Sequence, residues 1–103
     1  MTVATDTEIK LDEKIEKTID EPGKYHVIFL NDDSTPMEFV IEMLTHVFKH
    51  SKETAEKIML EIHNNGSGIA GTFNFEIAEQ KANETISYAR GNGFPLNIKI
   101  EKA

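Results

Sequence analysis

Three groups of side chains in this sequence could do chemistry, and the first is a run of one amide and two carboxylates. Asn31, Asp32 and Asp33 directly follow an apolar stretch. Their oxygens could hold a cation or accept hydrogen bonds from one. Asn and Asp also favour turns, and Asp suits the positively polarised start of a helix. The residue types alone therefore leave a cation-binding turn and a purely structural turn both open.

Histidines form the other two groups. His63 lies four residues after Met59, so the two would share one face of a helix, where a neutral imidazole could accept a hydrogen bond. The alternative is a histidine that only stabilises a helix C-terminus. His46 and His50 have the i, i+4 spacing of two metal ligands, but a stable site needs three or four. No third ligand has a matching spacing, so we expect a solvated face and no metal.

Motifs for covalent catalysis or phosphate binding are missing from the sequence. It contains no cysteine, no Gly-x-Ser-x-Gly turn and no phosphate-binding loop with Lys-Ser/Thr. Residues 66–71 are rich in glycine, but they precede an expected strand and do not open a helix after one, which a dinucleotide loop would do. We therefore predict neither an enzyme nor a bound cofactor.

The elements that would position these side chains begin with a strand over 25–30, which is rich in aromatic and β-branched residues. A helix is predicted next, with Thr35 as N-cap, Pro36 at the first position and Glu38 completing a capping box. Ser51 is expected to cap a second helix, which Gly66 ends by taking a left-handed conformation.

The remaining elements alternate strand, helix and strand. Ile69, Gly71, Phe73 and Phe75 alternate with smaller or polar residues and predict a second strand. Asn74 can cap a third helix that runs to about residue 90, and a last strand follows over about 96–101. The order βααβαβ predicts a single-domain α+β fold, with a three-stranded antiparallel sheet and three helices packed on one face.

Composition and charge limit the classes of function. Residues 1–24 carry seven acids and four lysines, few apolar residues and no aromatic, so we expect a flexible extension at 1–24 and a core domain at 25–103. The chain has 11 basic and 18 acidic residues and a net charge of −7, which lacks the basic footprint of a nucleic-acid binder. Apolar runs are too short to span a membrane, and no secretory signal is visible. We expect a cytoplasmic monomer.

Two motifs carry a family resemblance. Residues 31–40 (NDDSTPMEFV) resemble the signature of ClpS, the adaptor of bacterial Clp proteases, and residues 58–63 (IMLEIH) resemble its second-helix motif. The segments 79–82, 88–90 and 95–96 fit the rest, so the likeness runs from about Tyr25 to Ala103. Ser34, Ala70 and the turn at 91–94 depart from the family pattern, outside the expected pocket.

The resemblance implies an adaptor that binds the N-terminal residue of a substrate protein, usually Phe, Tyr, Trp or Leu. The adaptor hands the substrate to the ClpA unfoldase and the ClpP peptidase. By this resemblance the substrate's α-amino group is bound by Asn31, Asp32, Asp33 and His63. The side-chain pocket is lined by Leu30, Thr35, Met37, Val40, Met59, Ile62 and Leu96. The resemblance further implies that Glu76 and Lys81 face the N-domain of the unfoldase.

Simple energetics agree with recognition of the substrate's α-amino group and its first side chain together. Burial of a Leu or Phe side chain contributes roughly 1.5–3 kcal/mol, and each hydrogen bond to a charged group about as much before desolvation. Micromolar binding needs about −8 kcal/mol, so neither contribution suffices alone.

Two alternatives stay open. One is an interaction module of the same fold without N-terminal recognition, such as the C-terminal domain of the ribosomal stalk protein. The other is a metal-dependent hydrolase built on His46, His50 and the Asp pair.

Overall fold

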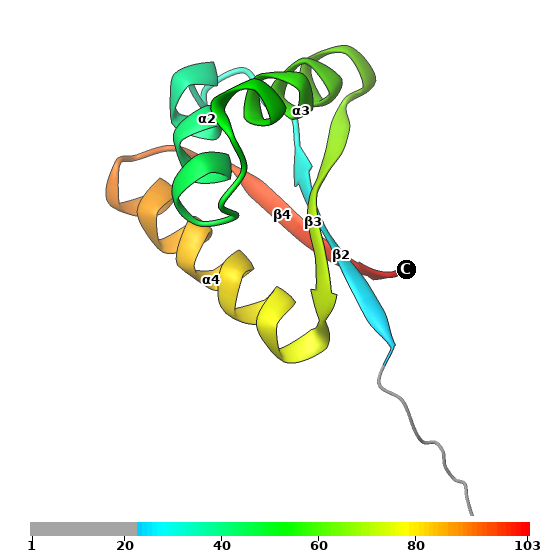
Figure 1. Ribbon diagram of the computed structural model, residues 1–103. Helices are drawn as coiled ribbons and strands as arrows, with labels where there is room; N and C mark the ends of the chain where they lie inside the picture. Colours follow the sequence, from blue (N-terminus) through cyan, green and yellow to red (C-terminus); the bar gives the residue numbers. More distant parts are fainter. Residues whose placement is uncertain (1–22) are drawn as a thin grey trace, which may run out of the picture.

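The computed structural model describes residues 23–103. Residues 1–22 of the predicted extension lie outside the described residues. The elements are β2 (Lys24–Leu30), α2 (Met37–His46), α3 (Lys52–Asn65), β3 (Ser67–Asn74), α4 (Phe75–Gly91) and β4 (Asn97–Lys102) (Figure 1). Both outer strands run antiparallel to the central β2, in the order β3-β2-β4. The predicted α+β fold with the order βααβαβ is confirmed.

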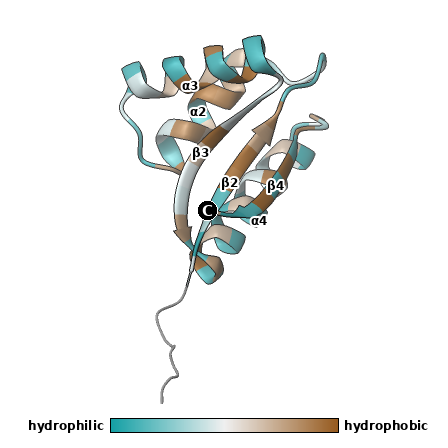
Figure 2. Ribbon diagram, turned by 90° about the vertical axis from the view of Figure 1, so that its right-hand side faces the viewer, coloured by the Kyte–Doolittle hydropathy of each residue, from teal (hydrophilic) through white to brown (hydrophobic). Residues whose placement is uncertain are grey.

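The core lies between the sheet and the helices, which cover the same face of the sheet (Figures 1 and 2). Val27 and Phe29 of β2 point into it and are fully buried, since alternate residues of a strand face the same side. Leu44, Ile62 and Leu96 fill it from α2, α3 and the segment before β4. Within residues 23–103 no helix is long and apolar enough to cross a membrane.

A β-bulge in β3 changes which side chains reach this core. Val27 pairs with Gly71 and Ile28 pairs with Ile69, so Ala70 is the extra residue on β3. An extra residue shifts the alternation by one position. Ala70 is consequently buried, whereas Ile69 is 43% exposed. The predicted second strand is confirmed as β3, but the bulge turns Ile69 away from the core, and Phe75 belongs to α4.

Most of the predicted helix ends are confirmed. The Ser51 hydroxyl accepts a hydrogen bond from the Thr54 N–H at 3.2 Å, and the Asn74 side chain accepts one from the Ile77 N–H at 3.0 Å. Gly66 ends α3 with φ at 87°, a left-handed conformation that costs glycine little because it lacks Cβ. This αL cap reverses the chain from α3 into β3.

Candidate functional site

Asp32 organises the turn that joins β2 to α2. Its Oδ1 accepts hydrogen bonds from the N–H groups of Ser34 and Thr35, both at 2.8 Å. Its Oδ2 accepts one from the Thr35 hydroxyl, also at 2.8 Å. The predicted capping box was therefore wrong, because Thr35 uses its side chain on Asp32 and Pro36 occupies the N-cap position of α2 without a side-chain bond.

The same contacts set the charge state of this carboxyl. Burial raises the pKa of Asp32, but hydrogen bonds from Thr35 and Ser34 and the nearby positive charge of Arg90 outweigh it. The pKa consequently lies below its ordinary value of 3.8. Asp32 is thus ionised at neutral pH and presents a negative charge at the mouth of the turn.

A hollow opens beside this turn, with a polar edge and an apolar floor. It is lined by Phe29, Leu30, Asn31, Asp32, Thr35, Val40, Met59, Ile62 and Leu96. Apart from Phe29, all of these were singled out in the sequence. Phe29 was expected only as part of the strand. The sequence feature that could have identified it as a lining residue was its position next to the predicted pocket residue Leu30. The space inside is about 10 Å³, roughly enough for one water molecule.

Three elements and two connecting segments supply this lining, which the chain brings together over long sequence separations. Leu30 ends β2, Val40 lies in the first half of α2, Met59 and Ile62 share one face of α3, and Leu96 precedes β4. Val40, Met59, Ile62 and Leu96 are all buried. The apolar floor is therefore part of the hydrophobic core, whereas the 31–35 turn and the half-buried Leu30 form the edge that faces solvent.

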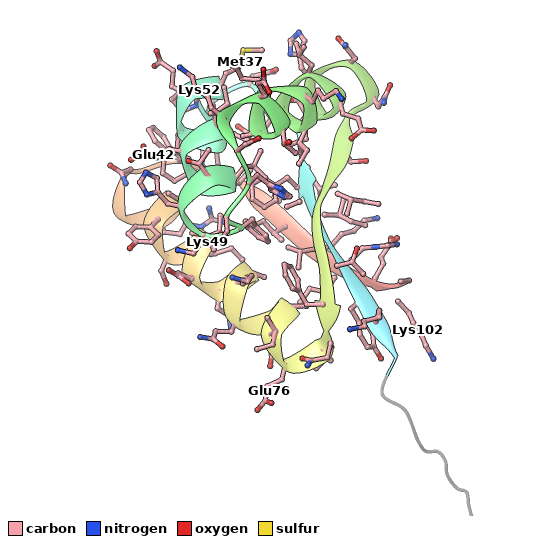
Figure 3. The ribbon with its side chains drawn as sticks, viewed as in Figure 1. Met37, Glu42, Lys49, Lys52, Glu76 and Lys102 are labelled. Carbon is pink, nitrogen blue, oxygen red and sulfur yellow. The ribbon has the colours of Figure 1, made fainter. Side chains whose placement is uncertain are left out.

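Three predicted residues do not line the hollow. Asp33 and His63 are exposed, and Met37, in the first turn of α2, is 43% exposed (Figure 3). His63 nevertheless follows the lining residue Ile62, near the C-terminal end of α3. The Asn31 N–H donates to the carbonyl of Gly66, at that same helix end, at 2.9 Å. This bond joins the turn to the end of the helix that carries His63.

Glu76 and Lys81 lie on α4. Glu76 is exposed in its first turn, at the opposite end of the molecule from Met37 (Figure 3). Lys81 is half-buried, and its Nζ donates to the Val47 carbonyl at 2.8 Å and lies 5.5 Å from the ring centre of Phe73. Lys81 thus joins α4 to the end of α2, a structural role that the sequence did not predict.

His46 and His50 lie in different surroundings. The Nε2–H of His50 donates to the Ala70 carbonyl, so this nitrogen holds a hydrogen bond inside the domain, whereas His46 is exposed. Among the residues that the structure describes, no three His, Cys, Asp or Glu side chains are grouped so that they could bind a metal.

Known proteins resemble this chain in fold and in sequence. The family described as "ATP-dependent Clp protease adaptor protein ClpS" matches residues 20–99. An adapter protein ClpS from Zymomonas mobilis is 46% identical over 81% of this chain and 78% of its own length. One from Burkholderia mallei is 41% identical over 88% of both chains. The structure of Agrobacterium tumefaciens ClpS2 bound to L-phenylalaninamide superposes with a TM-score of 0.78, at 38% identity, over 81% of this chain and all of that one.

These matches show the class of protein to which the chain belongs: small adaptor proteins of a protease. Since the family match covers most of the chain, this chain belongs to the ClpS family of Clp protease adaptors.

Proposed function

We propose that this chain binds the N-terminal residue of substrate proteins when that residue is Phe, Tyr, Trp or Leu. It then delivers them to a protease made of a ClpA-type unfoldase and ClpP. The role is non-catalytic. The observation that carries the proposal is the hollow, where an ionised carboxylate and an amide meet an apolar floor. The L-phenylalaninamide bound to Agrobacterium ClpS2 is a Phe unit with a free α-amino group, which has both features of such a ligand.

The polar edge retains acceptor capacity for an ammonium group. A carboxylate has about four lone-pair sites, and Asp32 uses three of them on its own turn. The Asn31 side chain is exposed at the same edge, and its backbone N–H is already bonded to Gly66. The three N–H donors of an α-ammonium could therefore meet Asp32, Asn31 and the His63 imidazole. An internal peptide group lacks this charge and these donors.

The floor must open to take a bulky side chain, because the hollow has room for only about 10 Å³. Met59 lines it, and unbranched methionine side chains adapt to differently shaped neighbours. We expect Met59 to change rotamer, and the exposed Met37 to fold over the bound side chain. Burial of that side chain contributes roughly 1.5–3 kcal/mol, from which the cost of this opening is subtracted.

The test is a set of binding isotherms for one decapeptide with Phe, Leu, Ile or Ala at position one, and for the Phe peptide with an acetylated α-amino group. We expect binding of the Phe and Leu peptides alone. Asn31→Ala should weaken binding about tenfold, since one hydrogen bond to a charged group contributes about 1.5 kcal/mol or more. Asn83→Ala, on the exposed part of α4, is the matched control. Retained affinity for the acetylated peptide would refute recognition of the ammonium. Absence of all binding would favour the interaction module without N-terminal recognition.

Delivery is tested separately through Glu76. Its side chain is exposed and far from the hollow, so Glu76→Ala should leave peptide affinity unchanged and slow degradation of a Phe-initial substrate by the unfoldase and peptidase. Glu79→Ala, also exposed on α4, provides the comparison. Equal degradation rates for the two variants would remove Glu76 from the partner surface.

A further inference from the structure

A second concavity lies between α2 and α4. Its volume is about 350 Å³, against about 10 Å³ for the hollow. It is lined by Phe39, Glu42, Met43, His46, Val47, Glu84, Tyr88 and Asn92. None of these residues lines the hollow, so this α2–α4 groove is a separate feature.

The floor of the groove is apolar and held in place. Phe39 and Met43 of α2 and its C-cap residue Val47 follow one another at about one helical turn, and all three are buried. The Phe39 ring packs edge-on against Phe94, with ring centres 4.9 Å apart. At the α4 side, the amide of Asn92 donates to the Tyr88 carbonyl at 2.9 Å. The groove is thus preformed by packing and needs no rearrangement to accept a side chain.

The rim of the groove is acidic and aromatic. Glu42 on α2 and Glu84 on α4 border it, and Glu42 is on the side of α2 nearer α4 (Figure 3). Tyr88 is 51% exposed beside Glu84. No Lys or Arg belongs to the lining, and within residues 23–103 neither glutamate forms an ion pair. Among the described residues, two carboxylates without an ion-pair partner therefore border the apolar floor, together with the imidazole of His46.

We propose that the α2–α4 groove binds an Arg side chain presented by a protein partner. The guanidinium would lie between the Glu42 and Glu84 carboxylates, where it can donate several hydrogen bonds in a fixed plane. Its aliphatic stem would lie on Phe39, Met43 and Val47, as long cationic side chains cover apolar surface while the charge stays in water. The face of the Tyr88 ring offers a further contact for a planar cation.

The charge of the groove also limits its occupants. Phosphate groups and acidic peptides would be repelled by the two glutamates. The chain's own segment 1–24 has a net charge of −3 and contains no arginine, so it is a poor complement. A second copy of the chain has a net charge of −7 and would bring few cations to the contact. A basic partner segment fits the groove best.

The probe is an acetylated and amidated pentapeptide with Arg at its centre and Ala elsewhere, compared with the same peptide carrying Gln. Acetylation leaves no α-ammonium, so the probe tests the groove independently of the proposed N-terminal recognition. The full-length protein is titrated and followed by backbone amide NMR shifts. We expect the Arg peptide alone to shift amides that line the groove on α2 and α4, and the binding to weaken as salt is raised.

Charge-neutral variants complete the test. Glu42→Gln with Glu84→Gln should weaken Arg-peptide binding about fivefold, since exposed charge pairs each contribute only a fraction of a kcal/mol to about 1 kcal/mol. Glu53→Gln with Glu56→Gln, exposed on α3, removes the same charge elsewhere and should leave binding unchanged. The proposal would be overturned if both pairs of substitutions weakened binding of the Arg peptide equally, or if the Gln peptide bound as well as the Arg peptide. Amide shifts spread over the whole surface, or no shifts at all, would also overturn it. A Phe-initial decapeptide titrated on the same samples keeps the two proposals distinguishable, because it should bind both double variants equally.

Discussion

Asp32→Asn isolates the charge of the carboxylate that organises the β2–α2 turn. Asparagine keeps the shape of the side chain, and its carbonyl oxygen can still accept from the N–H groups of Ser34 and Thr35. Its amide nitrogen would replace Oδ2 and donate to the Thr35 hydroxyl, which can turn to accept. The variant therefore keeps the three contacts and loses only their charge assistance.

The magnitude follows from these three bonds of 2.8 Å. A net hydrogen bond to a charged group contributes about 1.5–3 kcal/mol and a neutral one about 0.5–1.5 kcal/mol, so the loss is about 1 kcal/mol per bond before solvent screening. Because Asp32 is partly exposed, we expect the free energy of unfolding to fall by about 1–2 kcal/mol in total. For a domain of this size, each 1 kcal/mol corresponds to a Tm shift of about 4–8 °C.

The dependence on pH tests the origin of this difference. The pKa of Asp32 is lower in the folded protein than its ordinary value of 3.8, so the carboxylate stabilises the fold above that pH. This stability is lost as the pH falls through the folded pKa, where the carboxyl becomes neutral like the amide. Urea unfolding should show the full gap between wild type and Asp32→Asn near neutral pH, and a gap that narrows below about pH 4.

Asp33→Asn is the control for this experiment, because Asp33 is exposed and neighbours Asp32 in the same turn. We expect its effect to stay within about 0.5 kcal/mol, as for most surface substitutions. If Asp32→Asn costs as much in acid as at neutral pH, charge assistance is not the source of the stability. An equal cost for Asp33→Asn would show that the turn responds to net charge and not to these hydrogen bonds.

Two further predictions concern the elements around the site. Gly66→Ala should lower the free energy of unfolding by about 1–2 kcal/mol, since φ is 87° there, whereas Gly91→Ala, at a helical position with open space around it, should be neutral or stabilise by up to about 1 kcal/mol. Equal thermal shifts for the two would contradict the αL explanation. Lys81→Met should cost about 1–3 kcal/mol by leaving the Val47 carbonyl without its donor, which chemical denaturation can measure. Wild-type stability in this variant would show that the bond to Val47 does not stabilise the fold. The partner contact implied by the family resemblance would then be the remaining role for Lys81.

Much of the fold was predictable because its signals are local. The caps at Ser51 and Asn74 and the left-handed glycine at 66 involve residues within four positions of each other, and the apolar periods of strand and helix are short-range too. The order of elements and the packing of helices on one face follow from those periods. Apart from Phe29, the residues that line the hollow were singled out through the family resemblance. Of the residues predicted for the pocket and for the α-amino group, only Asp33, Met37 and His63 lie outside the lining.

Tertiary structure decided what depends on pairing between distant segments. The bulge at Ala70 arises from the match between β2 and β3, and no pattern within residues 67–75 shows that Ile69 faces outward. Thr35 has the residue type of a helix cap, but the competing acceptor Asp32 takes its hydroxyl once the turn is formed. Likewise, the nearly closed hollow and the open α2–α4 groove depend on how far apart packed helices lie. Sequence determined which residues prefer each local state, and long-range packing decided which neighbours they met.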